Sequence, residues 1–396
     1  MKSRTKQSLM KRVNSQSSFT TTCKPSDTGT SYQLLHRTIW QHLSMREKKR
    51  LALYALLILL LMPLAAAQIY TVTDLGTLGG SESLGTGIND LAQVVGQSST
   101  VGDLTSHAFL WTKTGGMQDL GTLGGSYSRA FGINDSGRVV GWSSTDVRNL
   151  TTHAFLWTRT KGMQDLGTLG GCYSLAEAVN ARGQVVGGSM TTGCDFFDFH
   201  AFLWTKANGM QDLGTLGSHF SEATAINNLG QVVGVSAIDN NTAYHAFLWT
   251  KTEGMQDLGT LGGCFSIAAA INDLGQVVGE STTGCDPSSE RPFLWTKADG
   301  MQDLGAPPGV FGGLTAINTF GQVVGTFCLQ PCSGSEHGFI WTKATGWLDL
   351  NDLIPADSGW VLVVPFDINA WGQITGYGLI NGQVHAFLLT PNILRR

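Results

Sequence analysis

The chain has 396 residues, of which 42% are hydrophobic, 14% are charged and 51 are glycine, a composition typical of short buried strands joined by tight turns. Its formal net charge is −4, but residues 1–67 hold 11 of the 25 Lys and Arg and only 2 of the 29 Asp and Glu. The remainder therefore carries 14 basic and 27 acidic side chains, a charge of −13, which makes nucleic acid an unsuitable partner.

The first 67 residues differ from the rest of the chain. Residues 1–44 form a basic, polar extension, and translation can start either at Met1 or at Met45. From Met45 a basic stretch, an apolar run over 51–64 and three alanines follow one another, which is typical of a secretory signal peptide over 45–67. The alternative is a membrane anchor, but the run is short for a bilayer span of about 20 residues. We predict cleavage after Ala67, no stable membrane span thereafter, and an extracellular, periplasmic or cell-surface location.

A unit of about 46 residues fills the chain from residue 70 to residue 390. Each copy reads A-x-x-I-N-D-x-G-Q-V-V-G-x-S, then a variable stretch, then H-A-F-L-W-T-K-x-x-G-M-Q-D-L-G-T-L-G-G. A repeat at a fixed period indicates one supersecondary unit copied along the chain. The asparagine of the first block marks seven copies, 45 to 47 residues apart except for a longer last step: Asn89, Asn134, Asn180, Asn227, Asn272, Asn318 and Asn369.

Each unit contains four segments with the pattern of β-strands. A short stretch of small residues ends at Ile-Asn, and Asn-Asp-x-Gly then forms a tight turn into Gln-Val-Val-Gly. The third segment, His-Ala-Phe-Leu-Trp, places His, Phe and Trp on one face and Ala and Leu on the other. The fourth is Met-Gln-Asp-Leu-Gly. Because both faces of the third segment are apolar, neighbouring copies must cover each sheet.

Four antiparallel strands in each of seven units predict an all-β fold, a seven-bladed β-propeller over residues 68–396. The repeat begins on a fourth strand without a third, residues 70–76, and ends on a third strand without a fourth, residues 385–390. We therefore predict that the N-terminal strand joins the last blade, which closes the ring and removes its exposed edges. The alternative is an open solenoid of stacked β-coils, which gives no reason for this offset.

The unit H-A-F-L-W…M-Q-D-L-G-T-L-G-G resembles the HAF repeat, a family of bacterial repeat proteins expected outside the cell. The resemblance covers essentially all of residues 70–390, and its motif is specific. The chain departs from the motif at Arg291-Pro292, which replace His-Ala in the fifth unit, and at Ala92, which replaces glycine in the first. The resemblance implies secretion and a repeat architecture, and it implies no established reaction.

Histidine recurs at the start of the third segment, and aspartate recurs in Asp-Leu-Gly. A catalytic interpretation pairs one histidine with one aspartate as base and orienter. We instead predict that each histidine forms a hydrogen bond within its own blade, because an active site is normally single. The repeated tryptophans are predicted core residues. The histidines are His107, His153, His200, His245, His337 and His385, and the tryptophans are Trp111, Trp157, Trp204, Trp249, Trp295 and Trp341.

The sequence contains no motif for a cofactor or a metal. The Thr-Leu-Gly-Gly stretches lack the G-x-x-x-x-G-K-[ST] pattern that binds phosphate. No Cys/His spacing fits zinc, and the G-x-S-x-G hydrolase motif is absent. We predict no cofactor and no metal, and the sequence identifies no catalytic residue.

The units differ most between the second and third segments, in residues 191–199, 237–244, 282–291 and 327–336. In a four-stranded blade this loop shares a face with the connection that enters the blade, so one face of the ring is divergent. Variable loops on a rigid scaffold often bind ligands, although drift in unconstrained loops explains the variation equally well. The predicted binding residues are acidic and aromatic: Asp195, Phe196, Phe197, Asp198, Phe199 and Tyr244.

Two functions are compatible with this sequence. We favour a monomeric secreted or cell-surface binding scaffold that presents the divergent face to a glycan, a peptide or an envelope protein. The alternative is a propeller enzyme that acts on extracellular carbohydrate, a hydrolase or lyase. A hydrolase needs two carboxylates roughly 5–10 Å apart, and the sequence offers only Asp195/Asp198 and Asp349/Asp352/Asp357 outside the repeated positions.

Six cysteines remain once Cys23 of the leader is set aside, and an even number in a secreted chain indicates disulfides. One pair of cysteines occupies the same two repeat positions in the third unit as another pair does in the fifth. Those positions lie on loops that share a face, so their Cα atoms can come within roughly 4.4–6.8 Å. We predict the bridges Cys172–Cys194, Cys264–Cys285 and Cys328–Cys332.

Overall fold

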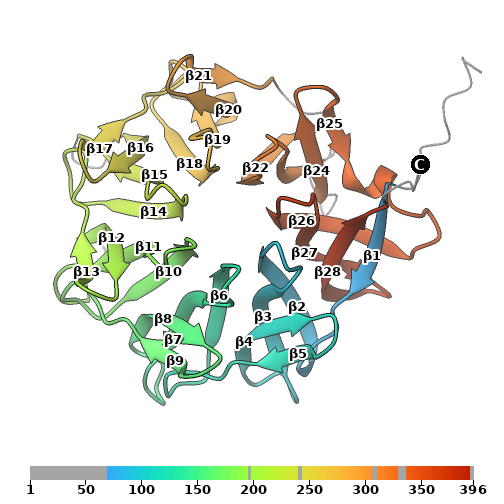
Figure 1. Cartoon of the computed structure of the whole chain (residues 1–396). Helices are drawn as coiled ribbons and strands as arrows, with labels where there is room; N and C mark the ends of the chain where they lie inside the picture. Colours follow the sequence, from blue (N-terminus) through green and yellow to red (C-terminus); the bar gives the residue numbers. More distant parts are fainter. Residues whose placement is uncertain (1–68, 195–197, 240–242, 306–309, 329–335, 393–396) are drawn as a thin grey trace, which may run out of the picture. The chain divides into compact units, whose positions relative to one another are not determined.

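A computed structural model of the protein describes residues 69–194, 198–239, 243–305, 310–328 and 336–392. The chain divides into two units, residues 1–65 and 66–396, and every described residue belongs to the second. The predicted extension and signal peptide therefore lie outside the described residues. The second unit is all-β, with seven four-stranded antiparallel sheets arranged as the blades of a β-propeller (Figure 1).

The first two strands of each blade lie nearest the centre of the ring (Figure 1). The innermost strands are β2 (Gly79–Ile88), β6 (Ser128–Ile133), β10 (Ser174–Val179), β14 (Ser221–Ile226), β18 (Ser266–Ile271), β22 (Val310–Ile317) and β26 (Trp360–Ile368). The second strands are β3 (Val94–Thr100), β7 (Val139–Ser144), β11 (Val185–Met190), β15 (Val232–Ala237), β19 (Val277–Thr282), β23 (Val323–Cys328) and β27 (Ile374–Ile380).

The other two strands of each blade form its outer part. The third strands are β4 (Ser106–Thr112), β8 (Thr152–Thr158), β12 (Phe199–Thr205), β16 (Tyr244–Thr250), β20 (Glu290–Thr296), β24 (Glu336–Thr342) and β28 (Gln383–Pro391). The fourth strands are β5 (Gly116–Asp119), β9 (Gly162–Asp165), β13 (Gly209–Asp212), β17 (Gly254–Asp257), β21 (Gly300–Asp303), β25 (Gly346–Asp349) and β1 (Tyr70–Asp74). Blades 1 to 6 begin at β2, β6, β10, β14, β18 and β22, and blade 7 combines β26, β27 and β28 with β1. Two short 3-10 helices, η1 (Pro287–Ser289) and η2 (Leu350–Leu353), lie in connections.

The predicted closure of the ring by the N-terminal strand is confirmed. Strand β1 pairs antiparallel with β28, from Tyr70 opposite Pro391 to Asp74 opposite Phe387. The innermost strand of blade 7 also contacts that of blade 1. The open solenoid is therefore excluded, because its first and last units would lie far apart.

The hydrophobic core lies between neighbouring blades, as the two apolar faces of the third strand predict. Ala108 and Leu110 of blade 1 pack with Phe155 and Trp157 of blade 2, and the other blade pairs repeat this arrangement. All seven phenylalanines of this repeat position are fully buried: Phe109, Phe155, Phe202, Phe247, Phe293, Phe339 and Phe387. Each blade thus contributes one face to the apolar layer on either side of it. Without the neighbouring blades, both faces would be exposed to solvent.

The ring has two different ends. We call the end with the turns between first and second strands and between third and fourth strands the turn face. The other end, with the loops between second and third strands and the connections between blades, is the loop face. The turns into the second strand place glycine at positive φ, as predicted, from Gly137 (70°) to Gly372 (73°). In the first unit Ala92 adopts the same conformation with φ 57°, at a cost of about 1–2 kcal/mol.

A closed ring of hydrogen bonds lies at the turn face. The side-chain amide of each repeated asparagine donates to the backbone carbonyl of the next one, at 2.9 to 3.1 Å, and Asn369 donates to Asn89 to complete the circle. Each asparagine side-chain oxygen also accepts backbone N–H groups of its own turn, as Asn272 does from Leu274 and Gln276. These buried amides therefore fix each turn and join all seven blades.

Candidate functional site

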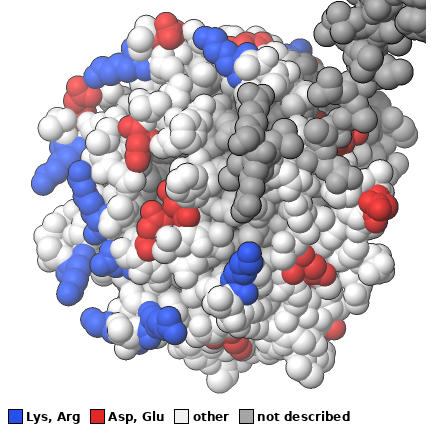
Figure 2. Space-filling model, turned by 45° about the vertical axis from the view of Figure 1, so that its right-hand side comes forward, with Lys and Arg blue, Asp and Glu red and all other residues white. Residues whose placement is uncertain are grey.

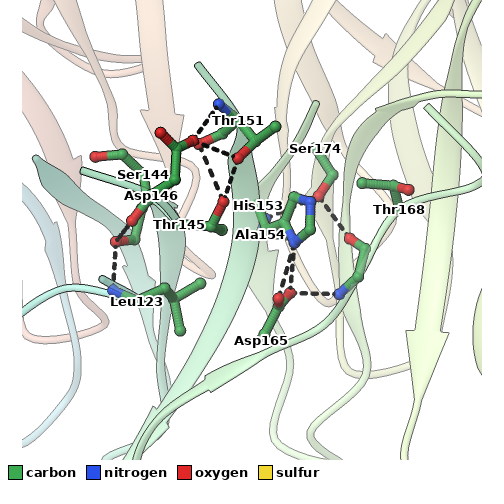
Figure 3. A network of polar contacts seen from close by, with 12 residues as sticks. Leu123, Ser144, Thr145, Asp146, Thr151, His153, Ala154, Asp165, Thr168 and Ser174 are labelled. Atoms are coloured by element: carbon green, nitrogen blue, oxygen red, sulfur yellow. Dashed lines mark hydrogen bonds and ion pairs between the residues drawn. The ribbon is translucent and has the colours of Figure 1, made fainter. Parts of the chain in front are cut away.

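The repeated histidines are structural, as the sequence predicts. In six blades the His Nδ1 lies 2.5 to 3.0 Å from the aspartate that ends the fourth strand, from His107–Asp119 to His385–Asp74. Figure 3 shows the blade 2 copy, in which Asp165 also accepts the backbone N–H of Gly167 at 2.7 Å. Since an ionised carboxylate only accepts hydrogen bonds, His Nδ1 donates and these pairs tie the third strand to the fourth.

In five blades a repeated serine of the next blade bonds to the residue after this histidine, as Figure 3 shows for Ser174. The backbone N–H of Ala154 donates to Ser174 Oγ at 2.8 Å, and Ser174 Oγ donates to the carbonyl of Gly167 at 2.6 Å. Blade 5 has Pro292 at the alanine position, and a proline has no N–H to donate. Blade 6 has Gly312 at the position of the serine that would accept this N–H. Both partners of the hydrogen bond are therefore absent together, and no serine hydroxyl loses its donor.

The predicted binding residues have different environments on the loop face. Asp195, Phe196 and Phe197 lie outside the described residues. Asp198 is half-exposed and lies 3.3 Å from His219 Nδ1. Phe199 is buried, with 4% exposure, so its role in binding a ligand remains a prediction. It packs between Tyr173 and Phe220 because the first residue of β12 points toward the neighbouring blade.

An arc of aromatic rings runs along the loop face across blades 3, 4 and 5. The successive ring centroids of Tyr173, Phe199, Phe220, Tyr244 and Phe265 are 5.8 to 6.4 Å apart, within the range of favourable aromatic pairs. All except Phe199 keep part of their surface exposed. The predicted residue Tyr244 thus belongs to a larger aromatic surface, which we call the aromatic arc.

A cavity of about 530 Å³ lies within the central channel, lined by the innermost strands. Each innermost strand has a β-bulge, and the bulged residue lines this cavity: Thr86, Phe131, Glu177, Thr224, Ala269, Thr315 and Phe366. Bulges commonly redirect a side chain next to a functional site. Unlike the asparagine ring, these seven positions hold four residue types (three Thr, two Phe, one Glu and one Ala), so the channel wall is not symmetric.

Carboxyl groups dominate the polar side chains of the channel. Burial raises the pKa of Glu177 to about 8, and the nearby Glu222 raises it further while Arg129 opposes the shift. Burial also raises the pKa of Glu222, and it lowers the pKa of Arg129. The Arg129 Nε is buried without a hydrogen-bond partner. The channel wall therefore places Glu177, a carboxyl group that binds a proton readily, beside the Arg129 guanidinium, with the buried Glu222 near it.

Two further acidic groups line the channel. Burial raises the pKa of Glu280 to about 8, helped by the neighbouring Glu290, although the backbone N–H of Leu314 donates to it at 3.1 Å. Burial raises the pKa of Asp367 to about 6. Asp367 accepts the N–H of Ile88 at 2.9 Å and so joins blade 7 to blade 1, which indicates a structural role.

The other predicted carboxylate cluster does not form a site. Asp349 lies 2.5 Å from His337 Nδ1 and accepts the N–H of Asn351 at the start of η2. Asp352 lies within η2, and Asp357 is exposed in the following turn. These three residues therefore lie at or within the connection between β25 and β26. The sequence prediction missed the channel carboxyls because they occupy variable positions inside the repeated first and second strands.

The two long disulfides, Cys172–Cys194 and Cys264–Cys285, are present with Cα atoms 5.3 and 5.0 Å apart. Each joins the connection that enters a blade to the loop after that blade's second strand. The predicted partner of Cys328, Cys332, lies outside the described residues. Among the described residues no group of three or more His, Cys, Asp or Glu could hold a metal ion. The described part of the chain also has no helix long and apolar enough to cross a membrane.

Comparisons with known proteins define the fold class. No family model and no curated protein matches the chain. The propeller domain of the trilobed protease from Pyrococcus furiosus, described as having an open velcro topology, aligns with a TM-score of 0.52 at 9% identity over 82% of this chain and 97% of that one. TolB from Acinetobacter baumannii aligns with a TM-score of 0.43 at 10% identity over 73% and 76% of the two chains. A gluconolactonase from Xanthomonas campestris aligns with a TM-score of 0.42 at 9% identity over 84% and 93%.

The similarity to the protease propeller domain, at 9% identity, bears on the fold alone. The chain is a seven-bladed β-propeller. Its ring is closed through strand β1, in contrast to the open topology described for the protease domain.

Proposed function

We propose that this protein is an exported binding module that holds a glycan at its loop face. The observation that carries the proposal is the concentration of non-repeated aromatic and acidic side chains at the loop face and in the channel, where no ring of identical residues like the turn-face asparagines runs through every blade of the described chain. In a repeat protein the repeated residues build the scaffold, so the departures from the repeat are the candidates for recognition.

The chemistry of this region suits a sugar. The aromatic arc offers flat apolar surfaces, and Glu177 in the channel, with Glu222 nearby, offers oxygens that accept hydrogen bonds from hydroxyl groups. The arc and the channel carboxyls are close, since both carboxyls raise the pKa of the Tyr173 hydroxyl, after the larger effect of burial. Ligand pockets generally combine aromatic walls with a few polar groups in this way.

The two disulfides support the export that this function requires, because disulfides persist in oxidising compartments. A cleaved signal peptide over 45–67, a monomeric state and membership of the HAF repeat family remain predictions from the sequence.

The test is a glycan and peptide array with the protein recovered after export of the full chain, followed by calorimetric titration of the best ligand. We expect a glycan ligand whose Kd rises at least about 10-fold in Glu222→Gln and in Tyr244→Ala, equivalent to about 1.4 kcal/mol each. Glu253→Gln, an exposed glutamate of the turn face, is the matched control and should leave the Kd unchanged. Peptide binding alone, or glycan binding that both loop-face variants retain, would overturn the proposal.

An enzyme acting on extracellular carbohydrate is the second candidate, favoured by the adjacent Glu177 and Glu222. A carboxyl group with a pKa of about 8 is protonated at neutral pH and can serve as a general acid beside a second carboxyl. If this candidate is right, the array ligand is cleaved on incubation and Glu177→Gln abolishes cleavage while binding persists. An intact oligosaccharide after prolonged incubation with the native protein excludes hydrolysis and lyase chemistry on that ligand.

A further inference from the structure

A second cavity, separate from the channel, lies between the outer parts of blades 2 and 3. Its volume is about 390 Å³, within the range of small-molecule sites. Leu156, Leu166 and Trp204 contribute apolar surface. Its other walls come from the turns of the turn face, and four of the residues there are basic: Arg138, Lys161, Arg182 and Lys206. We call this cavity the basic groove.

Three of the four cations are departures from the repeat. Arg138 stands where the other six units have glutamine, as in Gln184 and Gln231. Arg182 stands where blades 4 and 5 have the exposed residues Leu229 and Leu274. Lys161 is the third non-repeated cation, because the corresponding residues elsewhere are glycine, asparagine, glutamate, aspartate and threonine. These changes fall in two adjacent units and meet in one cavity.

The positive charge of the basic groove is not neutralised by the surrounding protein. In the described part of the chain, no hydrogen bond or ion pair engages the side chains of these four cations. The one carboxylate in the lining, Asp165, is already bound by His153 and by the N–H of Gly167. In blades 4 and 5, by contrast, the turn that follows the third strand carries an acid beside its lysine, Glu253 or Asp299.

Arg138 also reaches across the blade boundary, whereas the Arg182 guanidinium reaches toward Gly230 of blade 4, 4.0 Å from where a Cβ atom would lie. The guanidinium of Arg138, on blade 2, lies against Gly183 of blade 3, where a Cβ atom would be 2.9 Å from its Nη1. Gly183 directly follows Arg182 in the same turn. Figure 2 shows the wider setting: in that view lysine and arginine side chains gather toward the left edge of the molecule, while acidic ones are scattered.

We propose that the basic groove binds a phosphate-bearing ligand. Arginine presents a planar fork of donors that matches phosphate oxygens, and lysine adds a point charge. A phosphate carries about two negative charges, so a ligand with one or two phosphates matches several unpaired cations better than a single carboxylate does. The apolar wall with Trp204 leaves room for the organic part of such a ligand. The groove is lined by outer strands and turn-face turns, so this activity is independent of glycan binding at the loop face.

The repeat itself supplies a variant that keeps the fold. Arg138→Gln, Lys161→Asn and Arg182→Leu together restore residues that other blades carry at the same positions. The matched control, Lys251→Gln with Lys297→Gln and Lys343→Gln, removes the same charge from the turn face at other blades. Thermal unfolding of both variants, compared with the native chain, verifies that neither change disturbs the ring.

Binding is measured by calorimetric titration with inorganic pyrophosphate and by sedimentation with vesicles of phosphatidylcholine containing phosphatidylglycerol. We expect binding to at least one probe, weakened at least about 10-fold in the groove variant and less than about 2-fold in the control. Binding of pyrophosphate identifies a soluble phosphate ligand, and binding of vesicles alone identifies a lipid headgroup. Equal weakening in both variants would mean diffuse attraction to the turn face, and that result, or no binding to either probe, refutes the proposal.

Discussion

The turn face and the loop face of the ring differ in how much they vary from blade to blade. At the turn face the seven asparagines of the hydrogen-bonded ring are all buried and bonded alike. At the loop face the loops after the second strands differ in length and sequence, and two of them are held by disulfides. The repeated asparagines therefore hold the seven blades together at the turn face. The loops of the loop face can differ from blade to blade because each is anchored within its own blade.

The charge of the two faces differs as well. The turn face carries nine basic side chains, Lys113, Arg138, Arg159, Lys161, Arg182, Lys206, Lys251, Lys297 and Lys343. It has only five acidic ones, Asp90, Asp135, Glu253, Asp273 and Asp299. The described loops after the second strands hold one basic residue, Arg148, against five acids: Asp103, Asp146, Asp198, Asp239 and Asp286. The net charge of −13 over residues 68–396 thus combines two surfaces of opposite character, which would attract different ligands.

The largest effect is expected from removing the covalent support of the loop face. Changing Cys172 and Cys194 to serine, or Cys264 and Cys285, should lower the free energy of unfolding by about 3 kcal/mol for each pair, since a bridge across about 20 residues restricts the unfolded chain. Urea denaturation of each double variant measures the loss. A midpoint equal to that of the native protein would contradict the disulfide assignment.

A smaller loss is expected at the turn face. Asn272→Ala removes the amide that donates to Asn318 and the oxygen that accepts two N–H groups of its own turn, which should cost about 2 kcal/mol. Leu274→Ala, in the same turn but 72% exposed, is the control and should change the stability by less than about 0.5 kcal/mol. Because the ring is uniform, Asn227→Ala should cost the same as Asn272→Ala in denaturation experiments. Unequal losses of stability would show that the asparagines contribute differently to stability although their hydrogen bonds have the same geometry.

The smallest effect concerns the channel and depends on pH. The folded pKa of Glu177, about 8, lies above its ordinary value of 4.5, so the folded state binds more protons in between. Its stabilising contribution is complete below pH 4.5 and is lost as the pH rises through 8. Between pH 5.5 and 8.5 the native protein should therefore lose stability as Glu177 ionises, by an amount on the order of 1 kcal/mol because solvent screens this partly exposed group.

The control for this pH effect is Glu177→Gln, which cannot ionise. Glu280 and Asp367, whose pKa values are also raised by burial, change stability in the same direction and remain in the variant. The difference between the two proteins in urea midpoints at pH 5.5 and 8.5 therefore isolates Glu177. If stability depends on pH in the same way in the native protein and in Glu177→Gln, the pKa of Glu177 is not raised in the folded state.

The architecture could be predicted from the sequence because it depends on repeated features. The offset of the terminal strands predicted the β1–β28 pairing, and the matching cysteine positions predicted both long bridges. The asparagine was assigned only to its turn. Its hydrogen bond to the next blade was missed because the sequence pattern within one repeat unit does not show which residues of neighbouring units lie close together.

The candidate sites were much harder to predict. Glu177 faces the channel because a bulge shifts the strand register between Ala176 and Ala178, and nothing in the local sequence marks that shift. The basic groove combines Arg138 with Arg182, 44 residues apart, and this proximity follows only from the packing of adjacent blades. Phe199 was assigned to the variable loop, but strand β12 begins at this residue and its ring is buried.

The pairing of β1 with β28 also constrains how the protein folds. The partners Thr71 and Asn392, whose side chains lie 2.7 Å apart, are separated by 321 residues of chain. The last blade therefore cannot form until nearly the whole chain has been synthesised, and strand β1 has no partner strand until then. Closing so long a loop costs entropy that grows only with the logarithm of its length, but contacts of such high sequence separation form slowly. A chain interrupted anywhere before residue 383 lacks β28, so synthesis of the final strand decides whether the ring exists at all.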